Sequence, residues 1–499
     1  MSTAKKFAGQ TAIYGLSTIA SRTLTFFLTP LYVSVLPMGG YGIFTYMFSY
    51  ASVFNAVLSF GMETTFFRYL NKENSNKQEV YNNSFGAVVL VSLVFLALTM
   101  PFLHTVADLI QIGKTSYADF VKFARYVIII LVLDAWCVIP FAKIRADGHP
   151  GRFSLIKLIN VLIFVGLNLI FLVGFPFWQS HHLPGWQTVS GLVVANKIEY
   201  IFISNVVASA ITLLLLLPQI IQLRARFNLV VFKNMLMYSW PILVANLSFI
   251  VNENFDKLLL GKLLPSDISE AEVAIYGGCA KIAIFLSIFV QAFRLGAEPF
   301  FFSHAKSKNS GQTYARIMNY FVIAVCVIFL ALTANIEILK YFIKNEDYWV
   351  GLRVIPPLLF GYVSLGIYMN LSVWYKLSDQ TKYGLYISGI GAILTIVLNV
   401  IFIPKYSYMA SAYISLAAYT SMMILSYIWG QKNYPIPYNL KKNLAYIISS
   451  ALLVYISFYV FDRNIFIGNA LLVMFASVAL YFEWKNLSAI FINKNQEPK

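Results

Sequence analysis

The sequence has 499 residues, of which 59% are apolar and only 12% are charged. A soluble protein carries roughly a quarter of its residues charged, so this composition argues against soluble domains. The apolar residues form runs of about 20 or more, and a helix of that length crosses ~30 Å of hydrocarbon. We therefore expect a polytopic membrane protein.

The predicted membrane helices follow one another through the whole chain, mostly with short connections. The first extends from about Gln10 to Leu36, and we expect it to be retained because no short apolar region ends in a cleavage site. Further helices are expected to begin near residues 41, 83, 120, 154, 197, 235, 272, 313, 350, 382, 408, 441 and 466. The predicted fold class is an all-α polytopic membrane protein of about fourteen transmembrane helices.

The net charge of +16 follows the topology rather than marking a nucleic-acid surface. Most Lys and Arg residues lie at the N-terminus, in every second connection and at the C-terminus, as the positive-inside rule requires of cytoplasmic segments. Both termini are therefore predicted to be cytoplasmic, and no nucleic-acid partner is expected. Only four cations lie inside predicted spans: Arg22, Lys257, Lys281 and Arg294.

An internal repeat relates the two halves of the chain. A constant offset of 235 in the numbering carries Arg22 onto Lys257 without a gap, and a later segment at 167–171 resembles 398–402 at an offset of 231. The first offset also carries Pro30, Tyr41, Gly42, Gly61, Glu63, Phe66 and Phe67 onto Pro265, Tyr276, Gly277, Gly296, Glu298, Phe301 and Phe302.

Each copy of the repeat contains about six helices, so both copies have the same orientation in the membrane. Such copies are related by a pseudo-two-fold axis along the membrane normal. We predict one six-helix bundle over residues 1–233 and a second over 234–432. Residues 433–499 are predicted to form two additional transmembrane helices and a short cytoplasmic tail.

Charged side chains inside the spans are the candidate functional residues, because each costs at least ~2.5 kcal/mol at mid-bilayer unless it is paired or faces water. Arg22 lies in the first span. Its repeat mate Lys257 lies in a polar run with Asn252, Glu253 and Asp256. This run occupies more than one face of a helix, so it must line a cavity or interrupt the helix.

The span beginning near 272 carries a second group. Gln291, Arg294 and Glu298 follow the spacing i, i+3, i+7 and form one polar stripe, with Lys281 nearer the outer end. These residues suit an anion path. In the alternative interpretation, Glu253 with Lys257 and Arg294 with Glu298 are i, i+4 pairs that only neutralise each other.

Two further acids are candidates for ion pairing or coupling. Glu63 is expected at the cytoplasmic end of the second span, where it could meet Arg22 from the neighbouring helix. Asp134 lies alone in the fourth span, and intramembrane acids of this kind serve proton or ion coupling or pair with a neighbouring helix.

Motifs for catalysis and metal binding are missing from the sequence. The cysteines Cys137, Cys279 and Cys326 lie in apolar runs at unrelated spacings, so no disulfide framework or zinc site is supported. The chain has no phosphate-binding GxxxxGK[ST] loop and no HExxH or GxSxG motif. We expect a transporter rather than an enzyme, with no metal and no bound cofactor.

Several motifs resemble the oligosaccharide flippase, or polysaccharide transporter, family of the multidrug/oligosaccharidyl-lipid/polysaccharide (MOP) exporter superfamily. The resemblance covers nearly the whole chain and is most specific around the seventh and eighth spans. The residues that carry it are Phe255 to Gly261, Ile275 to Gly277, Gln291 to Arg294, Glu298 to Phe301, Gly61 to Glu63, Arg68, Tyr69, Asn399 and Pro404.

The resemblance implies two six-helix bundles around a central cavity lined by the first, second, seventh and eighth spans. It also implies a flippase that moves undecaprenyl-diphosphate-linked oligosaccharide from the cytoplasmic to the outer leaflet of the bacterial inner membrane by alternating access. The cargo would serve O-antigen of lipopolysaccharide, capsule or exopolysaccharide. A lipid II flippase and a small-molecule or multidrug exporter of the same fold remain alternatives.

If the chain transports such a cargo, its candidate site residues divide into two groups. The first is expected to bind diphosphate or sugar in the cavity, and the second to form ion pairs or to couple transport to H⁺, Na⁺ or the membrane potential. The chain is expected to act as a monomer, beside polysaccharide polymerase or assembly proteins. The first group is Arg22, Lys257, Lys281, Arg294, Asn252 and Gln291; the second is Glu63, Asp134, Glu253, Asp256 and Glu298.

Overall fold

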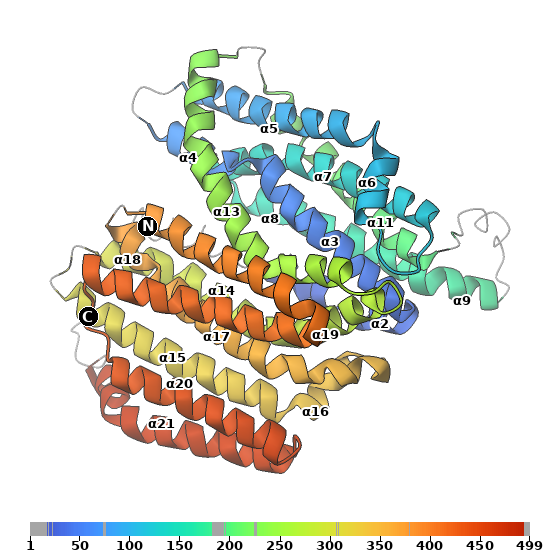
Figure 1. Cartoon of the computed structure of the whole chain (residues 1–499). Coiled ribbons are helices and arrows are strands. Elements are labelled where there is room, and N and C mark those ends of the chain that lie inside the picture. Colours follow the sequence, from blue (N-terminus) through green and yellow to red (C-terminus); the bar gives the residue numbers. More distant parts are fainter. Residues whose placement is uncertain are drawn as a thin grey trace. The chain divides into compact units, whose positions relative to one another are not determined.

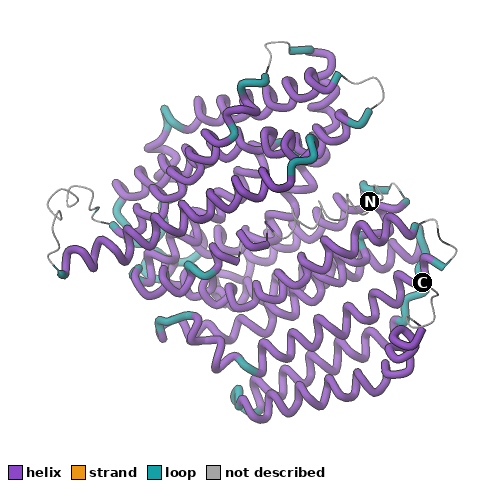
Figure 2. The backbone as a smooth tube through the Cα atoms, turned by 180° about the vertical axis from the view of Figure 1, so that it is seen from behind, coloured by secondary structure: helices purple, strands orange, loops and turns teal. Residues whose placement is uncertain are grey.

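The computed structural model describes residues 17, 19–21, 23–72, 76–181, 194, 196–223, 227–305, 307, 309–378 and 380–493. These residues are helical or lie in short connections, and no strand occurs among them (Figure 2). The contacts within the chain divide it into two compact units. Unit 1 contains residues 1–278, 345–348 and 382–414, and unit 2 contains 279–344, 349–381 and 415–499.

The helices of unit 1 begin with the blue end of the chain in Figure 1. They are α2 (Thr29–Val35), α3 (Met38–Ser59), α4 (Met62–Leu70), α5 (Lys77–Thr99), α6 (Leu103–Ile110), α7 (Tyr117–Ala146), α8 (Pro150–Leu169), a π-helical turn (Ile170–Gly174), α9 (Phe175–Ser180), α11 (Lys197–Leu215), α12 (Leu217–Ile220) and α13 (Leu229–Leu263). Two long helices, α14 (Ser269–His304) and α19 (Lys382–Asn433), begin in unit 1 and end in unit 2.

Unit 2 contains the remaining helices. They are α15 (Ser310–Ala334), α16 (Ile336–Leu339), two 3-10 segments (Lys340–Phe342 and Glu346–Val354), α17 (Ile355–Leu371), α18 (Val373–Leu377), α20 (Leu440–Tyr455), a π-helical turn (Ile456–Val460) and α21 (Ile465–Asn493). Tyr348 and the two residues before it in the second 3-10 segment belong to unit 1.

The predicted fold class is confirmed. Within the described residues, twelve helices are long and apolar enough to cross a membrane, and a shorter apolar helix covers Ile19–Val35. The 52-residue α19 accounts for two predicted spans, because its backbone leaves helical geometry at Ser407 (φ 50°, ψ −140°). The Ser411 hydroxyl donates to Asn399 Oδ1 at 2.8 Å, a contact that a straight helix could not make across twelve residues.

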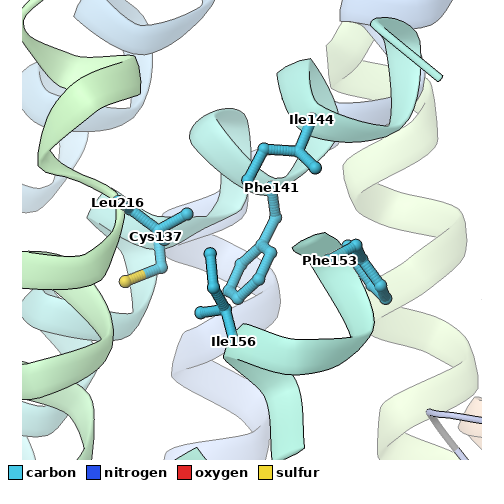
Figure 3. Packing of buried hydrophobic residues seen from close by; sticks show 6 residues of the cluster. All are labelled: Cys137, Phe141, Ile144, Phe153, Ile156 and Leu216. Atoms are coloured by element: carbon cyan, nitrogen blue, oxygen red, sulfur yellow. The ribbon is translucent and has the colours of Figure 1, made fainter. Parts of the chain in front are cut away.

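Unit 1 is held together at one end by an apolar cluster (Figure 3). Phe141 and Ile144 near the end of α7 pack against Phe153 and Ile156 of α8, and Leu216 closes the cluster from the α11–α12 junction. The rings of Phe141 and Phe153 meet edge to face at 5.3 Å. This packing fixes the C-terminal end of α7, where Arg145 lies.

Glycine allows α3 and the first turns of α14 to approach closely within unit 1. A Cβ atom on Gly42 would lie 1.9 Å from the backbone oxygen of Glu270, and one on Gly277 would lie 2.7 Å from Cγ2 of Thr45. Because Gly42 and Gly277 are mates in the sequence repeat, the offset of 235 relates two positions in a single contact between helices.

The last two helices pack against α15 in unit 2, as the red and yellow ribbons show in Figure 1. Their polar anchor is Glu483 of α21, which is 2% exposed. Its carboxylate pairs with Lys442 and accepts hydrogen bonds from Tyr446 at 3.3 Å and from Asn319 of α15 at 3.2 Å. A buried carboxylate with three partners ties α20 and α21 to α15.

Two repeat mates confirm that both copies use the same local geometry. Asn168 and Asn399 are fully buried, and each donates its side-chain amide to the carbonyl four residues earlier at 2.7 Å. Each also accepts a hydroxyl hydrogen bond, from Tyr32 at 3.0 Å and from Ser411 at 2.8 Å respectively. The domain boundaries predicted from the repeat, at 233 and 432, follow sequence similarity and stay a prediction, whereas the two units follow contacts.

Candidate functional site

The candidate residues lie in both units, and one of them, Arg22, lies outside the described residues. In unit 1 the polar run of α13 is the most developed group. Asn252 is 2% exposed and connects α13 to α19, because it donates to the Ser388 carbonyl at 3.2 Å and accepts from the Thr395 hydroxyl at 2.9 Å. Polar bonding of this kind inside an apolar region holds two helices in register.

One turn further along α13, Asp256 is 3% exposed and Lys257 is its ion-pair partner. The Lys257 ammonium lies 3.0 Å from Asp256 Oδ1 and 2.9 Å from the Glu253 carbonyl oxygen. The Tyr276 hydroxyl of α14 donates to Asp256 Oδ2 at 2.5 Å. Asp256 thus satisfies both a cation and a phenol in a buried position.

The alternative i, i+4 ion pair between the Glu253 and Lys257 side chains was wrong. The Glu253 side chain is exposed, and it is the backbone oxygen of this residue that accepts from Lys257. Asp256 takes the ammonium instead because Tyr276 already holds its carboxylate in place beside the lysine.

Glu63 and Asp134 also have partners within unit 1. Glu63 of α4 forms an ion pair with Arg145 at the end of α7, and the predicted partner Arg22 lies outside the described residues. The Arg145 guanidinium lies over the Phe67 ring at 5.0 Å. Asp134 Oδ1 accepts from the Ser209 hydroxyl of α11 at 2.7 Å, so its partner comes from a neighbouring helix.

In unit 2, the polar stripe of α14 borders a narrow recess between α14, α15, α17 and α18. Arg294 and Glu298 both line it. Glu298 pairs with Lys376 of α18 at 2.7 Å, so the alternative i, i+4 pairing of Glu298 with Arg294 was wrong. Arg294 is exposed and has no ion pair among the described residues, since the acid one turn away is taken by a cation from another helix.

The other two candidates on α14 are less informative. Gln291 donates to the Ser287 hydroxyl at 3.1 Å within the same helix, and Lys281 is half-buried nearer the start of unit 2. Sequence reasoning missed Tyr276, Arg145 and Lys376 as partners. The repeat could have indicated that Arg145 and Lys376 have the same role, because their numbers differ by 231. This is the offset found between 167–171 and 398–402.

Comparisons with known proteins agree with this architecture. Residues 241–401 match the MatE family model. The structure of the lipid II flippase MurJ in an inward closed conformation has a TM-score of 0.67 at 14% identity, over 94% of this chain and 99% of that one. This chain shares its fold with that flippase and with MATE family transporters.

Two further solved structures are similar to this chain. An inward-facing MATE family transporter of the MOP superfamily has a TM-score of 0.61 at 13% identity, over 85% of this chain and 94% of that one. A MATE transporter in a straight conformation has a TM-score of 0.58 at 12% identity, over 86% and 95%. No curated protein matches the chain in sequence. At these identities the likeness establishes the fold and leaves the cargo open.

Proposed function

We propose that this protein is a flippase that moves polyprenyl-diphosphate-linked oligosaccharide from the cytoplasmic to the outer leaflet of the bacterial inner membrane. The cargo would be a repeat unit of O-antigen, capsule or exopolysaccharide. The resemblance of its motifs to the oligosaccharide flippase family and the fold it shares with MurJ both support the proposal.

The observation that carries the proposal is a cation on a membrane helix that no carboxylate compensates among the described residues. Lys257, Lys376 and Arg145 each have a carboxylate partner, whereas Arg294 is exposed and has no ion pair among the described residues. A guanidinium cannot face hydrocarbon without partners, so it must face water or a polar ligand. Such a ligand needs acceptor oxygens, and a lipid-linked oligosaccharide supplies them in both its sugars and its diphosphate.

A small-molecule exporter of the same fold is less well supported. Exporters of cationic drugs use unpaired acidic side chains in the cavity, but Asp256, Glu298 and Glu63 are each paired with a cation. Only Glu253 and Asp134 of the candidate acids have no ion pair among the described residues. The lipid II flippase is the stronger rival, because MurJ covers 94% of this chain and its lipid also carries a diphosphate. The two differ in the sugar, so the chemical identity of the transported lipid separates them.

The deciding experiment follows the lipid intermediate in cells depleted of the protein, with a membrane-impermeant probe for outer-leaflet exposure. We expect lipid-linked oligosaccharide to accumulate on the cytoplasmic leaflet while surface polysaccharide falls, and mass spectrometry of the lipid identifies the sugar. Complementation with R294Q is expected to fail. K233Q, which removes an exposed cation at the start of α13, is the matched control and is expected to restore export.

Other outcomes would point elsewhere. Accumulation on the outer leaflet would indicate a polymerase or ligase. Accumulation of a peptidoglycan precursor would indicate a lipid II flippase. Loss of drug resistance with normal lipids would indicate an exporter.

We further propose that both termini are cytoplasmic, that the protein acts as a monomer beside polysaccharide assembly proteins, and that H⁺, Na⁺ or the membrane potential drives transport.

A further inference from the structure

The recess in unit 2 contains a polar group that the rest of the structure does not use. Asn370 of α17 lines it together with Arg294, Glu298 and Lys376, and aromatic and apolar side chains form the remaining wall. The free volume is about 10 Å³, which holds about one water-sized group. The recess therefore accepts a single atom group rather than a whole sugar ring.

The side-chain amide of Asn370 is buried and unsatisfied. The residue is 8% exposed, and its Nδ2 has no hydrogen-bond partner among the described residues. Burying an amide donor without a partner is costly, and buried polar groups in folded proteins are nearly always paired. A leucine has the same number of side-chain heavy atoms and carries no donor that needs a partner. Asn370 Nδ2 can therefore donate a hydrogen bond to an acceptor that the described residues do not supply.

Comparison of the two repeat copies distinguishes recess residues that hold helices together from recess residues that occur only in the second copy. Glu298 is the mate of Glu63 at an offset of 235, and Lys376 is the mate of Arg145 at an offset of 231. Both pairs form ion pairs within their own units. The helices that carry the two cations, α7 and α18, end at Ala146 and Leu377, again at an offset of 231. Because both copies have this ion pair, its role is to hold helices together.

Arg294 and Asn370 have no such counterpart. The same offsets lead back from Arg294 to Ser59 and from Asn370 to Ile139, so the first copy has a hydroxyl and an aliphatic side chain at these positions. Ile139 is fully buried, as an ordinary core residue would be. The two donors that border the recess therefore belong to the second copy alone.

We propose that this recess is a specificity site, in which Asn370 Nδ2 and the Arg294 guanidinium together bind one neutral oxygen acceptor of the cargo's sugars, a hydroxyl or an amide carbonyl. This inference rests on the proposed transport of a lipid-linked oligosaccharide. Glu298 compensates the charge of Lys376, so Arg294 alone remains to balance an anion. A single oxygen that accepts from an amide and a guanidinium fits this donor set better than a diphosphate does.

Binding measured on the purified full-length protein tests the site. The probes are polyprenyl diphosphate without sugar and polyprenyl diphosphate carrying one N-acetylhexosamine. We expect the wild type to bind the sugar-bearing lipid more tightly. N370L should weaken binding of that lipid about threefold to tenfold, the value of one hydrogen bond, and leave binding of the sugar-free lipid unchanged. N370Q, which keeps the amide, should retain part of the preference.

Folding is checked independently by thermal unfolding of the same variants. Because Asn370 Nδ2 is unpaired in the free protein, N370L should unfold at the same or a higher temperature than the wild type. I139L, at the mate position in unit 1, is the matched control and should change neither stability nor binding of either lipid.

Three results would overturn the proposal. Equal weakening of both lipids by N370L would place the acceptor in the diphosphate, and unchanged binding of both would exclude Asn370 from recognition. A much lower unfolding temperature would show that the amide has a structural partner. If the wild type binds neither lipid, the transport proposal fails with it, and this is seen before any variant is made.

Discussion

At the residue scale, the buried carboxylate of Asp256 is a closely constrained group beside the candidate site residues. It accepts from Tyr276 and pairs with Lys257, and the side chains of the pair are 4% and 17% exposed. In a buried ion pair the loss of one partner is more harmful than the loss of both, because the remaining charge is left without compensation. This asymmetry separates a structural role for Lys257 from a role in transport.

We therefore predict that K257M lowers the free energy of unfolding by roughly 3 kcal/mol. The double variant D256N/K257M should recover most of this loss, because the remaining amide still accepts from Tyr276. Unfolding of the purified protein in detergent measures both. If the double variant is stable and inactive in lipid export, Lys257 acts on the cargo; if it is stable and active, Lys257 is structural.

E253Q is the control for this prediction. Since the Glu253 side chain is exposed and only its backbone oxygen meets Lys257, the change should stay within about 0.5 kcal/mol. A loss as large as that of K257M would mean that the Glu253 carboxylate is the true partner.

At the scale of the elements, close approach of helices depends on single glycines. The contact of α3 with the first turns of α14 leaves no room for a side chain at Gly42, where a Cβ would lie 1.9 Å from the Glu270 backbone oxygen. Backbone atoms cannot rotate away as a flexible side chain can, so the helices would have to separate. Small residues at such crossings are typical of membrane helices.

The prediction is that G42A destabilises the protein by about 1 to 3 kcal/mol or more, the range for overpacking a tight site. G166A is the matched control, since nothing lies within 4 Å of a Cβ there. It should be neutral or slightly stabilising, because alanine favours helix over glycine. Thermal unfolding of the purified variants decides the matter, and equal effects of the two changes would contradict the close contact.

At the scale of the whole molecule, the distribution of positive charge predicts the orientation in the membrane. The connection at 111–116 between α6 and α7 should lie outside. The connection at 147–149 between α7 and α8 should lie in the cytoplasm, because basic residues flank it in both helices: Lys143, Arg145 and Arg152. The native cysteines provide a low background for labelling, because all three are buried and free.

Single cysteines introduced at exposed positions test this orientation. We expect K114C to react with a membrane-impermeant maleimide in intact cells, and H149C to react only after the membrane is permeabilised. The reverse pattern would place both termini outside. Reaction of both in intact cells would refute the span that contains α7.

The sequence predicted the elements better than their partners. The starts of the predicted spans fall within a few residues of the helix starts, since the length of an apolar run and its flanking charges are local properties. Two predicted starts are exceptions: the start near 10 lies outside the described residues, and the start near 408 lies within α19, where two predicted spans join across Ser407 without a loop. The membership of the candidate site stays a prediction, and the i, i+4 pairs of the alternative interpretation were wrong.

What the sequence determined by itself is therefore the all-helical membrane fold, the order of its spans and the internal repeat, because hydrophobic length and sequence similarity need no knowledge of neighbours in space. Only the tertiary structure decided which charges compensate one another. Glu63 with Arg145 and Glu298 with Lys376 are 82 and 78 residues apart. A charge buried among helices takes the nearest opposite charge that packing supplies, and packing brought these from other helices.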